Sequence, residues 1–145
     1  MIVQYNTSGR RGGIDVGAPY KLNISRDRVT DETAEVRMLA KNHSLLNFPN
    51  KIEASDFDGW VQERGLYFPN SWGKEFTPVL SMNDKDEPAR NGSLLVAKFG
   101  KGHYIYTGLS FFRELPAGVS GAYKLFANML SIGKENIKKQ TEVKE

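Results

Sequence analysis

The stretch that decides the fold is residues 100–114, GKGHYIYTGLSFFRE. Tyr104, Ile105 and Tyr106 have the aromatic and β-branched character of a strand. The strand runs into a loop at residues 108–114, GLSFFRE, and the loop leads towards a helix. The sequence therefore predicts a strand, a loop and a helix in direct succession.

A hairpin precedes this loop, and an amphipathic helix follows it. Residues 92–99 (GSLLVAKF) and 101–108 (KGHYIYTG) meet at a Gly-Lys-Gly turn, which is typical of a β-hairpin. After residues 116–118, apolar side chains recur at the helical spacing i, i+3, i+4 and i+7. These side chains are Val119, Ala122, Tyr123, Phe126, Met129 and Leu130, and Gly133 is expected to end the helix.

The remaining elements are predicted from shorter patterns. Residues 56–60 are expected to begin a short helix with Ser55 or Asp56 as its N-cap. Residues 26–35 are charged and expected to be exposed, and the glycine-rich residues 7–19 lack the spacing of a phosphate-binding loop. Further strands are predicted at residues 1–6, 20–25, 36–40, 65–68, where Pro69 is expected to stop the strand, and 76–82.

Composition excludes several classes of function. The chain has 145 residues, enough for one domain, which we place at residues 1–133, followed by a charged tail at 134–145 that is expected to be disordered. It has no cysteine, which rules out a thiol nucleophile and thiolate metal ligands. Its charge of +3 is scattered, so no nucleic-acid partner is predicted, and no apolar run is long enough to span a membrane. The sequence does not indicate the cellular compartment of the protein.

No metal site or other cofactor is predicted. His43 and His103 are the only histidines, and neither has a nearby pattern of carboxylates. We expect His103 to lie at the surface near the tip of the hairpin. The chain also opens directly in an apolar strand, which is typical of the second part of a larger domain.

The strand, loop and helix at residues 100–123 resemble the last catalytic segment of class I glutamine amidotransferase-like domains. That family has a Gly-x-Gln-Phe-His-Pro-Glu loop after the strand, and Gly108, Phe111 and Glu114 match its Gly, Phe and Glu. Phe112 stands at the position of the catalytic histidine. A phenyl ring cannot accept a proton, so general-base chemistry is not expected at this loop.

A longer resemblance links the chain to the glutamine amidotransferase-like domain at the C-terminus of bacterial LmbE-like (PIG-L-type) deacetylases. It begins near residue 36, and ThuA-like domains and β-galactosidase trimerisation domains are more distant relatives of the same kind. The matching segments are residues 43–47 (HSLLN), 58–67 (DGWVQERGLY), 91–96 (NGSLLV) and 108–123.

The resemblance implies an α/β domain with a three-layer, flavodoxin-like sheet, a β-hairpin and a C-terminal helix, lacking its N-terminal half. It also implies a non-catalytic binding or assembly module, with a homodimer or a deacetylase domain as partner. Ser110, Phe112, Arg113 and Glu114 would then form a vestigial loop, in which Glu114 faces the positive end of the helix or rims an old pocket. The alternative is an accessory or hydrolase domain that acts on N-acetylated sugars, with any deacetylase activity in another domain.

The sequence also suggests a carbohydrate ligand. Asp58 could accept hydrogen bonds from sugar hydroxyls, or it could simply be solvated. Aromatic side chains could form a platform for a sugar ring, or they could belong to the core. The candidate ligand-binding residues are Asp58, Trp60, Glu63, Arg64, Tyr67 and Trp72, where Glu63 and Arg64 could instead pair with neighbouring charges.

Overall fold

The computed structural model describes residues 1–4 and 16–135. Its centre is a four-stranded mixed sheet in the order β1 (Ile2–Gln4), β8 (Gly102–Thr107), β7 (Leu94–Phe99) and β5 (Thr77–Pro78). β1 runs parallel to β8, and the other neighbours are antiparallel. The hairpin predicted from the Gly-Lys-Gly turn is confirmed as β7 and β8. The predictions for residues 5–15 and 136–145 fall outside the described residues.

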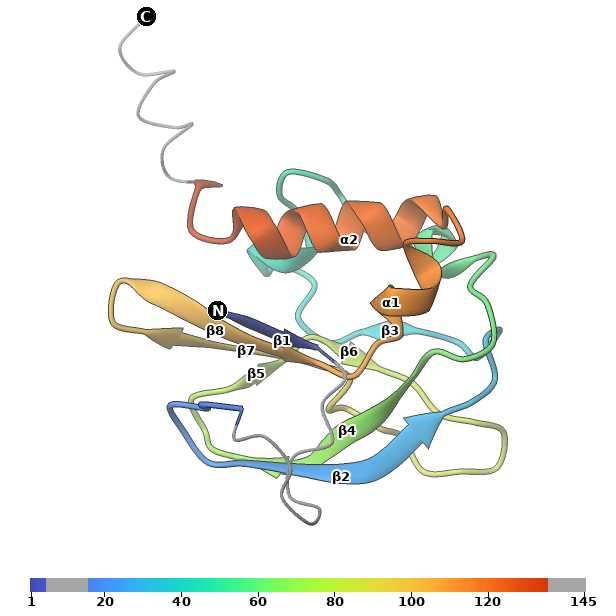
Figure 1. Cartoon of the computed structure of the whole chain (residues 1–145), viewed down its shortest axis with the longest axis horizontal. Coiled ribbons are helices and arrows are strands. Elements are labelled where there is room, and N and C mark those ends of the chain that lie inside the picture. The colour runs from blue at the N-terminus through green and yellow to red at the C-terminus, as the bar shows by residue number, and fades with distance from the viewer. Residues whose placement is uncertain (5–15, 136–145) are drawn as a thin grey trace, which may run out of the picture.

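The two faces of this sheet are covered by different kinds of structure (Figure 1). The helix α2 (Ser120–Ser131) lies over one face, as the apolar periodicity predicts. A two-stranded ribbon of β2 (Leu22–Val29) and β4 (Gly65–Trp72) lies over the other. The short elements are β3 (Arg37–Met38), β6 (Leu80–Ser81), the 3-10 helices η1 (Ser44–Leu46) and η2 (Ala54–Phe57), and α1 (Phe111–Glu114). The architecture is mixed α/β.

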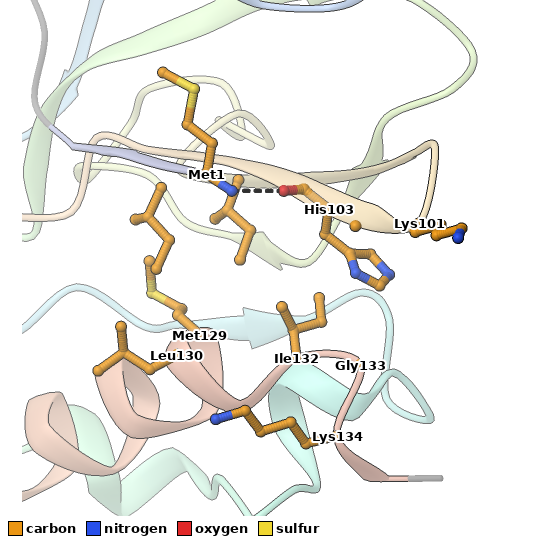
Figure 2. A pocket seen from close by; sticks show the side chains of 11 residues that line it. Met1, Lys101, His103, Met129, Leu130, Ile132, Gly133 and Lys134 are labelled. Atoms are coloured by element: carbon orange, nitrogen blue, oxygen red, sulfur yellow. Dashed lines mark hydrogen bonds between the residues drawn. The ribbon is translucent and has the colours of Figure 1, made fainter. Parts of the chain in front are cut away.

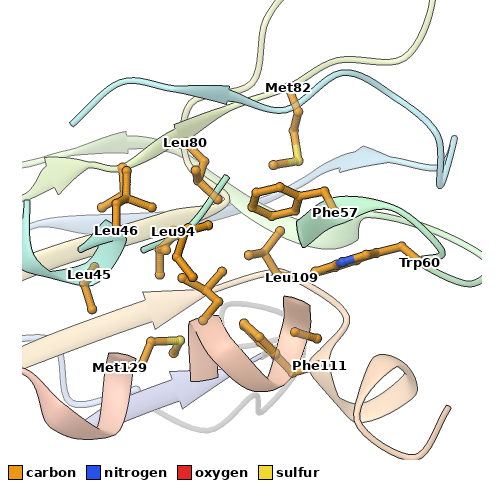
Figure 3. Packing of buried hydrophobic residues seen from close by; sticks show 14 of the residues in the cluster. Leu45, Leu46, Phe57, Trp60, Leu80, Met82, Leu94, Leu109, Phe111 and Met129 are labelled. Carbon is orange, nitrogen blue, oxygen red and sulfur yellow. The ribbon is translucent and has the colours of Figure 1, made fainter. Parts of the chain in front are cut away.

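Each face of the sheet has its own hydrophobic core, because side chains alternate along a strand. Leu94 and Val96 of β7 point into the core under α2, whereas Leu95 and Ala97 point towards the ribbon. Figure 3 shows the larger core, where Leu45, Leu46 and Met129 pack with aromatic residues from η2 and α1. The smaller core contains Phe76, Leu95, Ala97, Tyr104 and Tyr106.

Three sequence-based predictions of the elements are wrong. β4 continues through Pro69, which lies opposite Ile24 at a register shift where the ladder is irregular and a missing N–H matters little. β2 continues to Val29, which is fully buried, so residues 26–35 are not uniformly exposed. The predicted strand at 76–82 is divided into β5 and β6.

The short helix also begins earlier than its pattern predicts. Glu53 is the N-cap of η2, and Asp56 occupies the third helical position. The Asp56 carboxylate accepts a hydrogen bond from the Glu53 N–H at 2.8 Å and pairs with Lys124 Nζ of α2 at 2.7 Å. Asp56 therefore caps η2 from inside the helix and fixes it to α2.

Gly121 allows the backbones of α2 and η2 to approach closely. A Cβ at position 121 would lie 1.7 Å from the Asp56 carbonyl oxygen. Although alanine favours helices more than glycine, we expect Gly121→Ala to destabilise the protein by about 1–3 kcal/mol through overpacking. Chemical denaturation measures the change.

Gly102→Ala is the matched control for that substitution. A Cβ at position 102 meets no atom closer than the Phe99 carbonyl oxygen at 3.9 Å. We expect its free energy of unfolding to stay within about 0.5 kcal/mol of the parent. Equal stability of the two variants would contradict the close approach of α2 and η2.

Candidate functional site

The loop at residues 108–114 is fixed from both sides by backbone contacts. Gly108 packs so closely on β4 that a Cβ there would lie 2.6 Å from the Leu66 carbonyl oxygen. The Leu66 N–H in turn donates to the Gly108 carbonyl at 2.9 Å. Thr107 Oγ1 donates to the Ser93 carbonyl and accepts the Leu109 N–H. These contacts hold the entry to α1 in one conformation.

Ser110 and Glu114 use their polar atoms inside the protein, and both residues are fully buried. Ser110 Oγ donates to the Glu63 carbonyl at 2.9 Å and lies 3.0 Å from Glu114 Oε1. Glu114 Oε2 accepts the N–H of Val61 at 2.9 Å. The pair therefore connects α1 to the segment between η2 and β4. The sequence suggests two roles for Glu114, at the rim of a pocket or facing the positive end of the helix. In the structure its carboxyl oxygens instead contact the Val61 N–H and the Ser110 hydroxyl.

Burial raises the pKa of Glu114, although the hydrogen bonds from Val61 and Ser110 work in the opposite direction. The number of hydrogen-bond acceptors around Ser110 also favours the protonated form of Glu114. Ser110 has a single hydroxyl proton, and both the Glu63 carbonyl and Glu114 Oε1 are close enough to accept a hydrogen bond from it. A protonated Glu114 could then donate to Ser110 Oγ, which would satisfy every group in the cluster.

Phe112 and Arg113 lie at the surface beside this buried pair. The Phe112 side chain stands where the resemblance places a catalytic base, and it is 44% exposed. The guanidinium of Arg113 lies 4.8 Å from the centre of the Phe112 ring and pairs with Glu63 at 3.2 Å. The exposed part of the loop thus offers a phenyl ring and a paired cation, and neither can act as a general base.

Arg64 is buried and makes structural contacts. Its Nε and Nη2 donate to the Ala34 carbonyl at 3.1 and 2.8 Å, and its Nη1 donates to the Phe57 carbonyl. The guanidinium carbon also lies 5.7 Å from the centre of the Trp60 ring. Burial lowers the pKa of Arg64, while nearby acidic residues, Asp31 first among them, oppose this shift.

The structure brings three of the six candidate ligand-binding residues together. Asp58, Trp60 and Arg64 line a cleft of about 270 Å³. Sequence reasoning missed Glu32 and Thr33, which also line the cleft, because they are distant in sequence and carry no motif. Only 4% of Trp60 is exposed, and its ring packs against Phe57 and Phe111, so it offers no open face to a sugar.

The other three candidates lie apart from this cleft. Glu63 pairs with Arg113, as the ion-pair interpretation expects. The backbone carbonyl of Tyr67, in β4, accepts the Tyr106 hydroxyl at 2.8 Å. Trp72, at the end of β4, packs beside the smaller core and lines a different pocket. Trp60, Tyr67 and Trp72 therefore do not form one aromatic surface.

A larger groove, of about 450 Å³, lies between β1 and the end of α2 (Figure 2). Its apolar wall includes Met129, Leu130 and Ile132, and Lys101 and Lys134 lie at its rim. The Met1 ammonium donates to the His103 carbonyl at 2.8 Å across one end. Met1 and Leu130 are 69% and 57% exposed. The groove thus combines exposed apolar surface with basic groups.

β1 forms one edge of the central sheet, where β8 is its only strand neighbour among the described residues. The Ile105 N–H donates to the Met1 carbonyl at 2.9 Å, and Ile2 is paired with Ile105. In a parallel ladder alternate residues turn their N–H and C=O groups towards the same neighbour. The backbone groups of Ile2 therefore point outwards, beside the groove.

Comparisons with protein-family models, with curated proteins and with solved structures found no match to this chain. Within residues 1–4 and 16–135, no three His, Asp or Glu side chains are grouped as metal ligands would be. In the same residues, no helix has the length and apolar character needed to cross a bilayer.

The contact between Glu114 and Val61 can be tested by two substitutions. Glu114→Gln keeps an oxygen for the Val61 N–H and supplies an amide that can donate to Ser110, so we expect little loss of stability. Glu114→Ala leaves the Val61 N–H without its acceptor and should cost about 1–3 kcal/mol. Equal losses in urea denaturation would show that the carboxyl has no structural role.

The raised pKa of Glu114 also predicts the pH dependence of stability. Because the folded state holds this proton more tightly, the unfolded state releases it first as pH rises above about 4.3. The Glu114 contribution to the free energy of unfolding therefore falls with rising pH until the folded pKa is passed. Glu114→Gln lacks this titration, so the stability of the parent relative to the variant should fall between acidic and neutral pH. A constant difference would contradict the raised pKa.

Proposed function

We propose that this chain is a non-catalytic assembly module related to the C-terminal domain of LmbE-like sugar deacetylases. The proposal includes the three-layer, flavodoxin-like fold that the resemblance implies. The structure itself shows a mixed α/β architecture, which is a broader class. The observation that carries it is the outward-facing edge of β1, which lies beside an apolar groove.

The contacts of the 108–114 loop support a non-catalytic role. Catalysis by a family-like loop needs a base in contact with a nucleophile. Here the hydroxyl of Ser110 and the carboxyl of Glu114 are buried in contacts with each other and with backbone groups. Phe112 stands at the position of the base, and the chain has no cysteine.

The outward-facing N–H and C=O groups of Ile2 support assembly by strand addition. An edge strand of this kind can accept a strand from another polypeptide. Closed symmetric dimers are the commonest assemblies of identical chains, and a twofold axis would pair two β1 strands antiparallel. The exposed side chains of Met1 and Leu130 lie next to this edge and would lose contact with water.

The charges around the groove are compatible with such a pair. Lys101 and Lys134 lie at the Met1 end of β1. Antiparallel pairing places the two Met1 ends at opposite ends of the interface, so the basic rims of two copies are separated. The alternative partner is a deacetylase domain, a strand of which would occupy the same edge.

The alternative function, an accessory or hydrolase domain for N-acetylated sugars, is supported by one feature. Asp58 and Glu32 line the same cleft, and two carboxylates are the usual requirement for glycoside hydrolysis. The buried ring of Trp60 and the structural contacts of Arg64 leave little of that cleft for recognition of a ring. We therefore favour assembly.

Light scattering tests the proposal. The parent chain should form dimers as its concentration rises. Ile2→Pro removes the outward N–H but leaves the bond between Met1 and Ile105, so this variant should remain monomeric. The chain should likewise bind a separately prepared LmbE-like deacetylase domain through the same edge, and Ile2→Pro should reduce that binding.

Ile2→Ala is the matched control. It loses the same packing against the larger core but keeps its N–H, so it should still assemble. A parent that stays monomeric at high concentration and does not bind the deacetylase domain would overturn the proposal. Equal behaviour of Ile2→Pro and Ile2→Ala would place the interface elsewhere.

A further inference from the structure

One flank of α2 is closed by the two 3-10 helices. Gly121, Lys124 and Asn128 lie along this flank, since residues three and four apart are neighbours on a helix. Gly121 lies against the backbone of Asp56 in η2, and Lys124 pairs with the Asp56 carboxylate. Asn128 donates to the carbonyl of Leu45 in η1 at 2.9 Å. This side of α2 therefore has no free surface for a partner.

The opposite flank of α2 is apolar and open to solvent. Tyr123, Phe126 and Leu130 follow one another at spacings of three and four residues. At 3.6 residues per turn they lie about 180° around the helix axis from Gly121 and Asn128. Tyr123 is 52% exposed and Leu130 is 57% exposed, whereas Phe126 is half-buried beside Phe111. We call Tyr123, Phe126 and Leu130 the open flank.

The open flank lies on the same side of the molecule as the free edge of the sheet. Leu130 lines the groove between β1 and the end of α2, together with Ile2 (Figure 2). Tyr123 lies two turns before Leu130 on the same side of the helix. The outward-facing backbone groups of Ile2 and the open flank therefore face one and the same partner.

The charge of α2 favours a neutral, apolar partner surface. Lys124 is the only charged residue of the helix, and it pairs with Asp56 on the closed flank. A helix at the surface of a soluble protein usually presents charged and polar side chains to the solvent, and a helix that is apolar around most of its circumference is usually covered. The open flank thus has the composition of a surface that is buried in an assembly.

A second copy of the chain supplies such a surface in the right place. Two β1 strands that pair antiparallel are related by a twofold axis perpendicular to the sheet, so the same face of both sheets stays on one side. The two α2 helices then lie on that face, antiparallel, with their open flanks towards each other. Packed helices have axes about 8–10 Å apart, and large apolar side chains fill the space between them.

We propose that the open flank of α2 packs against the open flank of a second copy. The interface then has two layers, with the β1 strands paired in the sheet and the α2 helices paired above them. This inference rests on the proposed assembly through β1, and it assigns another copy of this chain, and not the deacetylase domain, as the partner. The antiparallel helices also bring opposite ends of their dipoles together.

The absence of cysteine from the chain allows a direct test by cross-linking. Tyr123→Cys and Leu130→Cys each introduce a single thiol on the open flank. Equal amounts of the two variants are mixed at a concentration at which the parent is dimeric, and a short bismaleimide is added. Antiparallel helices bring position 123 of one copy towards position 130 of the other, so covalent dimers should form. Leu39→Cys, at a leucine that is 46% exposed beyond the end of β3, is the control and should give only random cross-links.

Leu130→Glu tests the contribution of the open flank to affinity. The side chain is exposed in the single chain, so the variant should fold like the parent, which circular dichroism checks. Each dimer contains the substitution twice, so we expect the dissociation constant of the dimer to rise about a hundredfold. Leu39→Glu is the matched control and should dimerise like the parent.

The outcomes separate this inference from the proposed function. If Ile2→Pro is monomeric but Leu130→Glu and Leu39→Glu dimerise alike, the interface consists of strands alone and the helix contact is wrong. Cross-linking at the open flank that does not exceed that of Leu39→Cys leads to the same conclusion. If Leu130→Glu weakens only the binding of an LmbE-like deacetylase domain, the flank belongs to that partner and the inference is overturned. A parent that is monomeric at every concentration overturns the proposed assembly as well, and light scattering shows this before any substitution is made.

Discussion

The buried residue Arg64 joins four segments of the chain through its guanidinium and its backbone. Its donors end on the carbonyls of Ala34 and Phe57, and its own backbone N–H donates to Val29. Its carbonyl accepts the N–H of Ser110. The end of β2, the segment before β3, η2 and the 108–114 loop are therefore all fixed by one residue at the start of β4.

A buried cation normally needs a close counterion, and Arg64 shows how carbonyl groups can replace one. No carboxylate within salt-bridge distance of Arg64 occurs among the described residues. Instead, carbonyl oxygens and the rings of Phe57 and Trp60 surround the guanidinium, and more distant acidic groups offset part of its desolvation. The same contacts withdraw Arg64 and Trp60 from ligand binding. A residue pattern that suggests a binding site is used here to hold the fold.

The parts of the fold that follow from local pattern could be predicted from the sequence. The hairpin depends on two glycines and alternating apolar residues, and α2 depends on a helical period, so both are encoded within short windows. Pro69 and Val29 depend on tertiary contacts instead. β4 tolerates Pro69 because the ladder with β2 is already irregular there. Val29 is buried because the chain beyond it turns back over the larger core.

The candidate site, like the fold, could be predicted only in part from the sequence. The resemblance of the loop to a catalytic segment predicts Phe112 at the position of a base, and that prediction needs only the order of residues in the loop. The sequence cannot show that Glu114 accepts the N–H of Val61, since these residues are far apart in sequence. Nor can it distinguish Trp60 from Trp72. The first packs inside the larger core, whereas the second packs beside the smaller core and lines a pocket.

The groove beside β1 and the pocket lined by Trp72 share no residue, and this separation has a structural cause. β1 is an edge strand of the sheet itself, and the groove lies between it and the end of α2, whereas the pocket is built on the ribbon that covers the other face (Figures 1 and 2). The two hydrophobic cores are separated by the sheet itself. A strand added at β1 would extend the sheet away from β5, and it would leave the ribbon and its pocket open. The groove and the pocket are therefore built independently of each other, by different elements of the fold.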